Sequence, residues 1–194
     1  LAERAGAPVR DVLVADASRR TLKANAYVAG LGATRRLVLF DTLLERSERR
    51  EISAVVAHEL GHRRARHVAV LTLLGMAGAA LGVGALWLLL GGRAGDPRRI
   101  PLVLLVLGLL ELAALPLVAW LSRRFERAAD RFALELTRDA PALESAFRRL
   151  AATNVADLDP PRLVRALLGT HPTIPERIQA VRTLAAGTAR DSAA

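Results

Sequence analysis

Two long apolar blocks dominate the hydrophobic pattern of this chain. The first, residues 68–90, contains no charged residue, and the second, residues 100–121, contains only Glu111. A helix that crosses a bilayer needs about 20 consecutive apolar residues, so both blocks are long enough to span a membrane. A chain of 194 residues rarely buries two such helices on every side. The pattern therefore predicts two transmembrane helices rather than two core helices of a soluble domain.

The connector between the blocks, residues 91–99, carries Gly, Pro and charged residues, and it predicts a turn between antiparallel helices. The two spans then form a hairpin, so the chain enters and leaves the bilayer on the same side. Seven arginines lie in the segments next to the hairpin, whereas the connector contains three. By the positive-inside rule, this asymmetry places both flanks in the cytoplasm. The sequence thus predicts a multi-pass integral membrane protein whose soluble parts lie on the cytoplasmic face.

Before the hairpin, the pattern predicts short strands followed by helices. Short apolar runs that are typical of strands lie at residues 9–14, 27–31 and 36–40. We expect Asp41 to cap a short helix over residues 42–46 and Ser47 to cap a longer helix. In this longer helix the apolar residues recur at helical spacing.

After the hairpin, the pattern predicts three further helices. Apolar residues mark one face over residues 125–136, a second helix begins at Asp139 and ends near residue 153, and the last runs from Pro175 to about residue 184. Residues 185–194 are mostly small or polar, so we expect this tail to fray.

The expected fold class is mainly α, formally α+β, with a small N-terminal β element. Residues 1–66 and 122–194 are expected to form one domain at the cytoplasmic face. A helical hairpin over residues 67–121, with spans 68–90 and 100–121, interrupts that domain.

Composition narrows the chemistry that these elements can carry. The chain has 52% hydrophobic and 24% charged residues, which excludes a disordered chain. It has no Cys, so disulfides and Cys-ligated metal sites are excluded as well. The net charge is +9, but aromatic residues make up only 4% and we expect no nucleic-acid partner. Any metal must therefore be bound by Asp, Glu and the four His residues.

The residues His58-Glu59-Leu60-Gly61-His62 form an H-E-x-x-H motif on the helix after Ser47. Residues four apart lie one turn apart on one helix face, so both imidazoles can bind a single ion. Glu59 projects about 100° from His58 around the helix, where it flanks the metal without being an obvious ligand. This is the position expected for a general base that acts on a zinc-activated water.

Two histidines and a water leave a catalytic zinc one protein ligand short. If the helix continues, His67 lies about 180° from His58, so we expect an interfacial residue there rather than a ligand. An acidic ligand must return on the histidines' side of the membrane, and Glu126 does so five residues after the second span. Asp130, one turn further on, is placed to accept an imidazole N–H from a ligating histidine. The sequence thus predicts one zinc ion per chain, held by His58, His62 and Glu126.

Glu111 lies near the middle of the second span, where an ionised carboxylate costs about 2.5 kcal/mol or more unless it is paired or hydrated. Two interpretations stay open. Glu111 either faces an aqueous cavity along a substrate path or packs, protonated or hydrogen-bonded, against another helix.

The H-E-x-x-H motif, the hairpin and the E-x-x-A-D motif of residues 126–130 together resemble the gluzincin-like membrane zinc metalloproteases of the type-one CAAX prenyl protease family, whose relatives are the heat-shock membrane proteases. The resemblance extends upstream to Asn25-Ala26-Tyr27 and residues 36–44, and downstream to Asn154 and residues 171–177. It covers nearly the whole chain, and the upstream residues favour the prenyl-protease side. Members of that family have further membrane helices before the catalytic region, so we expect this chain, which opens at Leu1, to be a fragment.

The resemblance implies a zincin-like domain and places His171 and Asn25 near the substrate. We assign both to substrate binding and to stabilising the oxyanion, and we count His171 among the catalytic residues. The alternatives are a loop residue set by the following proline for His171 and a turn residue for Asn25. Arg177 is expected to pair with Glu126 or Asp130, or to cap a helix.

The sequence is therefore interpreted as a zinc-dependent integral-membrane endopeptidase in which Glu59 moves a proton from water to the leaving amine. Its partners would be the lipid bilayer and a protein or peptide substrate, with a prenylated C-terminus implied by the resemblance. Two alternatives are kept: a heat-shock-type protease that cleaves misfolded membrane proteins, and a non-catalytic membrane scaffold or sensor that retains the fold.

Overall fold

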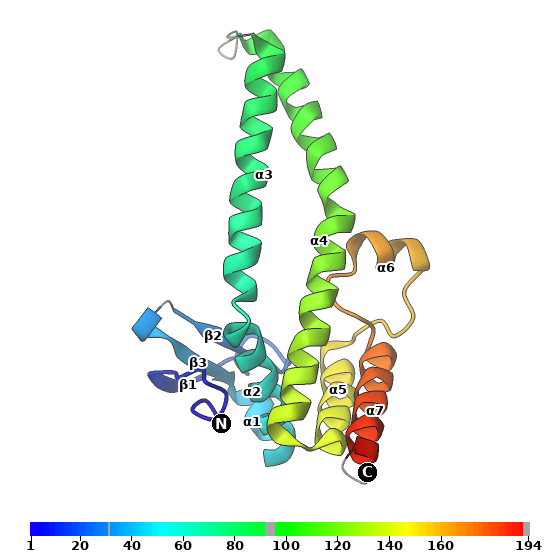
Figure 1. The fold of residues 1–194 in the computed structure, drawn as a ribbon. Helices are drawn as coiled ribbons and strands as arrows, with labels where there is room; N and C mark the ends of the chain where they lie inside the picture. Colours follow the sequence, from blue (N-terminus) through cyan, green and yellow to red (C-terminus); the bar gives the residue numbers. More distant parts are fainter. Residues whose placement is uncertain (31, 92–95, 192–194) are drawn as a thin grey trace.

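The computed structural model describes residues 1–30, 32–91 and 96–191. Two long helices rise together from a globular part that contains both chain ends (Figure 1). A small sheet lies on one side of this globular part, and shorter helices lie on the other. The fold class predicted from the sequence, mainly α with a small N-terminal β element, is confirmed.

The sheet has three strands in the order β1-β3-β2. β1 (Asp11–Ala15) is parallel to β3 (Arg36–Phe40), and β2 (Ala26–Ala29) is antiparallel to it. The third predicted strand has the bounds that the sequence indicated, whereas the first is shifted toward its C-terminal end. The second predicted strand included Leu31, which lies outside the described residues.

The helix that carries the H-E-x-x-H motif begins differently from the prediction. α1 (Asp41–Arg46) includes Asp41 as its first residue, and Ser47 ends α1 instead of capping α2 (Arg49–Arg64). Glu48 is the N-cap of α2, because it forms a reciprocal capping box with Glu51. The buried Glu51 carboxylate also accepts a hydrogen bond from the Arg149 guanidinium at 2.7 Å. This contact ties the start of α2 to α5 (Ala140–Asn154).

The candidate membrane hairpin consists of α3 (His67–Leu90) and the first part of α4 (Ile100–Thr137). The most apolar windows of these helices are only 11% and 6% buried, so they are not core helices of the described domain. α4 is a single helix, and it joins the predicted second span to the predicted helix over 125–136. Glu111 is exposed on α4. Of the predicted connector, residues 92–95 lie outside the described residues.

Three helices follow α4. α5 begins as predicted, with the Asp139 carboxylate accepting the Ala142 N–H at 3.1 Å. α6 (Arg162–Leu168) was not predicted. α7 (Ile174–Asp191) begins close to the predicted position but runs longer, so the predicted end near residue 184 is wrong. Residues 192–194 of the predicted tail lie outside the described residues.

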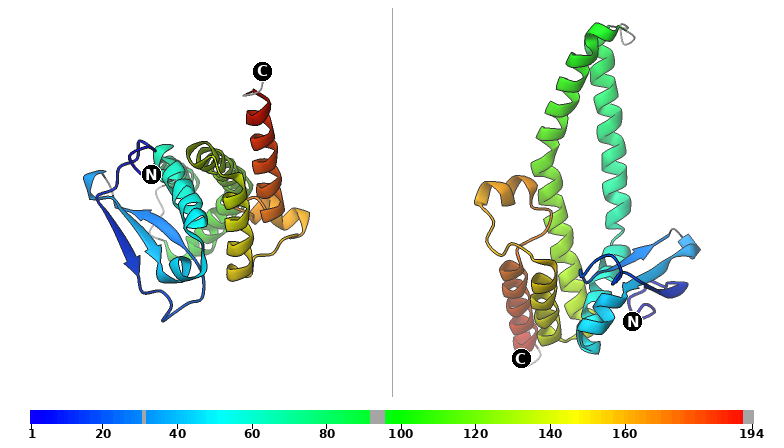
Figure 2. Two further views of the ribbon diagram at one scale, coloured as in Figure 1. Left: turned by 90° about the horizontal axis from the view of Figure 1, so that it is seen from below. Right: turned by 180° about the vertical axis from the view of Figure 1, so that it is seen from behind.

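α2 lies at the centre of the globular part, between the sheet and the C-terminal helices (Figure 2). Leu60 and Val56 face the sheet side, where they pack with Leu37 and Leu39 of β3. On its other side, α2 contributes small buried residues to a second cluster shared with α4, α5 and α7. Two cores on opposite faces hold α2 rigidly, which fixes the direction of its polar residues.

Gly61, inside the H-E-x-x-H motif, lets α2 and α4 approach closely. A Cβ atom at this position would lie 3.1 Å from Ala129 Cα and 3.1 Å from Phe132 Cδ1. Ala57 on α2 and Ala133 on α4, both fully buried, extend the same contact with small side chains. The close crossing brings the carboxylates of α4 within reach of the histidines of α2.

Replacing Gly61 with Leu is expected to force the two helices apart. Overpacking at a close contact costs about 1–3 kcal/mol, and the separation also moves Glu126 away from the histidines. We therefore expect a lower melting temperature and a lower zinc content, measured on the purified protein. Gly75→Leu is the matched control, because a Cβ at Gly75 meets nothing within 4 Å. Equal melting temperature and zinc content in Gly61→Leu and the unmodified chain would contradict this account.

Candidate metal centre

Three side chains from two helices converge beside the contact of α2 and α4. His58 and His62 lie one turn apart on α2, and their Nε2 atoms are 3.1 Å apart. The buried Glu126 of α4 lies opposite, with one carboxylate oxygen 3.5 Å from His58 Nε2 and the other 3.2 Å from His62 Nε2. The structure thus brings together the three residues that the sequence singled out as metal ligands.

The spacing of these atoms fits a divalent metal ion. Zinc binds imidazole nitrogen at about 2.0–2.1 Å and carboxylate oxygen at about 2.0–2.2 Å, usually in a tetrahedron, so two of its ligand atoms lie about 3.3 Å apart. The two imidazole Nε2 atoms lie 3.1 Å apart, close to that value, and each has a different carboxylate oxygen of Glu126 at 3.5 or 3.2 Å. One ligand atom from each of the three residues lies within 4.8 Å of the other two. The donor set of two imidazoles and one carboxylate is also one that catalytic zinc uses, with a position left for water.

Asp130 and Arg177 hold the His58 ring in place from its Nδ1 side, the side away from Glu126. His58 Nδ1 donates to an Asp130 carboxylate oxygen at 2.8 Å, which leaves Nε2 free to face Glu126. The Arg177 guanidinium of α7 donates to the same carboxylate, with Nε 2.8 Å from Oδ2. It lies 4.0 Å above the Phe147 ring. Of the alternatives for Arg177, the structure thus shows pairing with both carboxylates: Asp130 is hydrogen-bonded to it, and Glu126 Oε2 lies 3.8 Å from its Nη1.

The electrostatics of the cluster favour a positive charge. Burial lowers the pKa of the His58 imidazole, but its hydrogen bonds with Asp130 and Glu126 outweigh this effect and raise the pKa to about 9. Two buried carboxylates surround these imidazoles: Glu126 contacts both His58 and His62, and Asp130 contacts His58. An environment that stabilises an added proton in this way also suits a bound cation.

His67 supports His62 in a way that the sequence did not indicate. α2 ends at Arg64, with Ala65 as its C-cap, and Arg66 adopts a left-handed conformation with φ 56°, so the chain turns before α3 begins. This turn places His67 Nδ1 at 3.0 Å from His62 Nδ1, and the buried His67 ring stacks on Phe125 at 4.0 Å. The assumption of a continuous helix from His58 to His67 is therefore wrong, whereas the membrane-interface position of His67 stays a prediction. The tautomer of His62 in which Nδ1–H donates to His67 would leave Nε2 free for a metal.

Glu59 lies on α2 next to His58 and is half-buried. Burial raises the pKa of its carboxylic acid, although His58 and His62 work in the opposite direction. A partly desolvated carboxylate beside the two histidines suits a base that works close to the metal.

His171 reaches the same cluster from the loop between α6 and α7. Its Nε2 lies 3.5 Å from Glu126 Oε1, and its side chain is 64% exposed. Its Nδ1 lies 3.0 Å from Thr170 Oγ1. The ring is therefore beside the ligands and open to solvent, where a substrate can reach it.

Arg123 connects this loop to α4. Its guanidinium donates to the carbonyl oxygens of Arg165, at 2.9 Å, and Gly169, at 2.6 Å. Both carbonyls lie at the C-terminal end of α6, where Gly169 is the C-cap and its N–H also donates to the Arg165 carbonyl at 3.2 Å. Arg123 thus fixes the end of α6 two residues before His171. Arg123 is one of the seven arginines that flank the hairpin, and its sequence position indicates only a flanking charge.

Replacing Arg123 with Gln is expected to release the end of α6 and to misplace His171. A displacement of about 1 Å at a catalytic group can cost about 100-fold in rate. We expect kcat on a peptide substrate to fall by about that factor, while zinc content stays unchanged. Arg162→Gln, an exposed change at the other end of α6, should leave kcat unaltered. An Arg123→Gln enzyme with the kcat of the unmodified chain would refute this positioning role.

Asn25 lies in the segment before β2 and is exposed. Its amide oxygen accepts the Ala26 N–H at 2.9 Å, and its backbone carbonyl accepts the Phe40 N–H at 3.0 Å. Asn154, at the end of α5, holds the neighbouring residue, since its amide accepts from Ala24 N–H at 3.2 Å and donates to Ala24 O at 3.3 Å. The role of Asn25 in substrate binding stays a prediction.

Comparisons with known proteins agree with this site. Residues 1–185 match peptidase family M48. The chain is 35% identical to the uncharacterized metalloprotease YhfN of Bacillus subtilis, over 92% of this chain and 45% of that protein. It is 33% identical to a CAAX prenyl protease 1 homolog of Arabidopsis thaliana, over 90% of this chain and 43% of that protein.

The fold comparison gives the same result. The crystal structure of Ste24p from S. mikatae matches with a TM-score of 0.78 and 28% identity, covering 90% of this chain and 45% of that one. The chain spans a little under half the length of these relatives. The resemblance predicted from the sequence motifs is therefore confirmed. On the match over residues 1–185, the chain belongs to peptidase family M48.

Proposed function

We propose that the chain carries the active site of a zinc-dependent membrane endopeptidase, with one zinc ion per chain. The observation that carries this proposal is the convergence of His58, His62 and Glu126 at spacings that suit one zinc ion. The supporting contacts of Asp130 to His58 and of His67 to His62 agree with it, because ligating histidines usually donate their second N–H. The relatives include a protein named as a metalloprotease.

The chemistry follows from the residues around this cluster. A zinc ion held by His58, His62 and Glu126 would supply a water of pKa about 7 and a Lewis acid for the scissile carbonyl. Glu59 accepts the proton of the attacking water and passes it to the leaving amine. His171, exposed beside Glu126, donates a hydrogen bond to the carbonyl oxygen as negative charge develops there, and Asn25 is assigned to the same substrate side.

The site is proposed to face the cytoplasm at the membrane surface. α3 and the first part of α4 are long and apolar enough to cross a bilayer, and they are almost entirely exposed. Residues 1–66 and 122–194 would then form one domain on one side, with the hairpin of residues 67–121 in the bilayer. The arginine excess beside the hairpin favours the cytoplasmic side.

The substrate class is proposed from the relatives. The proteins named as CAAX prenyl proteases suggest a peptide with a prenylated C-terminus. We expect the chain, reconstituted with zinc, to cleave a farnesylated C-a-a-X peptide about tenfold faster or more than the same peptide without the lipid. The same preparation is tested on an unfolded membrane protein.

The outcomes of this comparison separate the candidates. Faster cleavage of the unfolded membrane protein than of the farnesylated peptide would contradict the prenyl-substrate proposal and favour quality control. Cleavage of neither substrate by zinc-loaded protein would favour a non-catalytic scaffold.

A further inference from the structure

A basic groove lies on the surface of α2 and α4, separate from the metal centre. It has a volume of about 600 Å³, and its lining includes four arginines and a single carboxylate: Arg64, Arg124, Arg127, Arg131 and Glu135. We call this feature the arginine groove. Its formal charge is strongly positive, and none of the proposed metal ligands lines it.

The helical geometry of α4 separates the arginine groove from the site. Successive residues turn by about 100° around a helix, so Arg124 and Arg131 point roughly 140–160° away from Glu126. Gly61 and Phe132, at the close contact of the two helices, form part of the groove wall. The arginine groove therefore opens on the far side of the helix pair from the ligands, and the proposed mechanism does not use it.

The guanidinium groups in the groove are available to a ligand. Within the described residues, no ion pair to a carboxylate is formed by Arg124, Arg127 or Arg131, and all three are exposed. Arg64 donates to the backbone oxygen of Ala5 at 3.0 Å, and its guanidinium lies 5.8 Å from the Phe132 ring centre. Unpaired guanidinium groups in a shared hollow are suited to bind phosphate oxygens in pairs.

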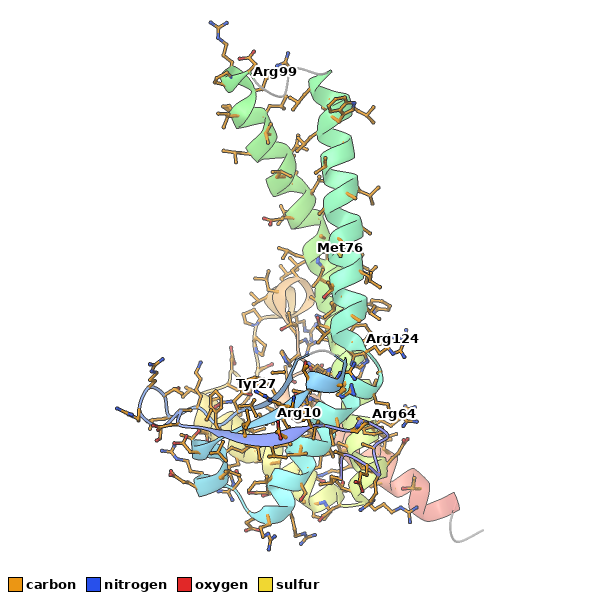
Figure 3. All side chains as sticks on the ribbon, turned by 90° about the vertical axis from the view of Figure 1, so that its left-hand side faces the viewer. Arg10, Tyr27, Arg64, Met76, Arg99 and Arg124 are labelled. Atoms are coloured by element: carbon orange, nitrogen blue, oxygen red, sulfur yellow. The ribbon has the colours of Figure 1, made fainter. Side chains whose placement is uncertain are left out.

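The position of the groove matches the headgroup region of a bilayer. Arg124 lies over the Trp120 ring at 5.6 Å, and Trp120 is in the last turn of the second apolar block. Tryptophan is enriched at membrane interfaces. Figure 3 shows Arg124 where the hairpin meets the globular part, with Arg64 below it on the same side. At 1.5 Å per residue, the arginines of α4 lie about 4–15 Å beyond the end of the span.

We propose that the arginine groove binds the phosphate of an anionic phospholipid from the leaflet that faces the globular part. This proposal rests on the membrane placement of the hairpin given above. A lipid is favoured over free phosphate because the exposed apolar sides of α3 and α4 rise directly beside the groove and can contact its acyl chains. Basic pockets beside membrane helices bind anionic headgroups for the same reasons. A zwitterionic lipid is expected to bind more weakly, because the positive charge in its headgroup is repelled by the arginines.

The test measures lipid retained by the full chain purified in neutral detergent, after incubation with phosphatidylglycerol or phosphatidylcholine, by native mass spectrometry. We expect retention of phosphatidylglycerol in preference to phosphatidylcholine. Arg127→Gln/Arg131→Gln should weaken phosphatidylglycerol binding by about 30-fold, the effect of two surface arginines. The matched control, Arg20→Gln/Arg148→Gln, removes the same charge from exposed positions elsewhere and should bind as the unmodified chain does. Melting temperature and zinc content verify that both variants are folded.

Three results would overturn the proposal. These are equal retention of the two lipids, an equal loss of binding in the control variant, and displacement of the lipid by inorganic phosphate at the lipid's own concentration. Flotation with phosphatidylcholine vesicles tests separately whether the chain inserts into a membrane. It therefore distinguishes a wrong lipid-binding proposal from a wrong membrane placement of the hairpin. A chain that inserts but shows no lipid preference contradicts the arginine groove alone, whereas a chain that does not insert contradicts both.

Discussion

Replacing Glu59 with Gln is expected to reduce the rate of peptide cleavage by about 10³-fold, while the zinc content stays at one ion per chain. General-base catalysis contributes about 10²–10⁴ to enzyme rates, and a glutamine amide cannot accept the proton of the attacking water. The substitution keeps the size of the side chain and leaves His58, His62 and Glu126 intact. The two measurements are kcat on a peptide substrate and zinc per chain by elemental analysis.

Glu45→Gln is the control for this experiment. Glu45 is an exposed glutamate in α1, so the same chemical change there should leave both the rate and the zinc content unaltered. Cleavage by Glu59→Gln at a rate close to that of the unmodified chain would remove Glu59 from its role as the base. It would leave the metal centre itself untouched.

Replacing Glu126 with Gln is expected to lower zinc affinity by more than about 100-fold and to abolish cleavage. Loss of a residue that only supports a ligand typically costs about 10–100-fold in metal affinity, and Glu126 is proposed to be a ligand itself. Asp130→Asn, which weakens the support of His58, should therefore have a smaller effect of about 10–100-fold. Both affinities are measured by competition with a zinc chelator.

Glu111→Gln is the matched control, because Glu111 lies exposed on the same helix. It should bind zinc as the unmodified chain does. If Glu126→Gln bound zinc as tightly as Glu111→Gln, Glu126 would not be a ligand.

Local sequence patterns predicted the helical hairpin and the residues that form the candidate metal centre. The two apolar blocks can be read directly from the chain, and the spacing of His58 and His62 puts them on one helix face. Glu126 and Asp130 followed because a hairpin returns the chain to the side where it entered. The same spacing argument places Asp130 one turn beyond Glu126, where it contacts His58.

Features that depend on contacts distant in sequence were missed. The left-handed residue Arg66 lies between α2 and α3, and nothing in its local sequence marks that turn, so the contact of His67 with His62 was not foreseen. Gly61 reads as an unimportant position within the motif until α4 is packed against it. α6 follows two prolines and has only seven residues, and Arg123 of α4 supports its end.

The start of α2 shows why capping is hard to predict. Ser47 is the better N-cap by residue type, but Glu48 takes that position. Its partner Glu51 is held by Ser145 and Arg149, nearly a hundred residues later in the chain. Tertiary contacts to Glu51 thus favour a helix start one residue later than Ser47 predicts.

The most direct test of the account is the position of zinc in crystals of the zinc-loaded chain, located by anomalous scattering at the zinc edge. We expect one zinc ion per chain, coordinated by the Nε2 atoms of His58 and His62 and by a carboxylate oxygen of Glu126 at about 2.0–2.2 Å. A zinc ion bound elsewhere, or one that contacts the two histidines with Glu126 turned away, would contradict it.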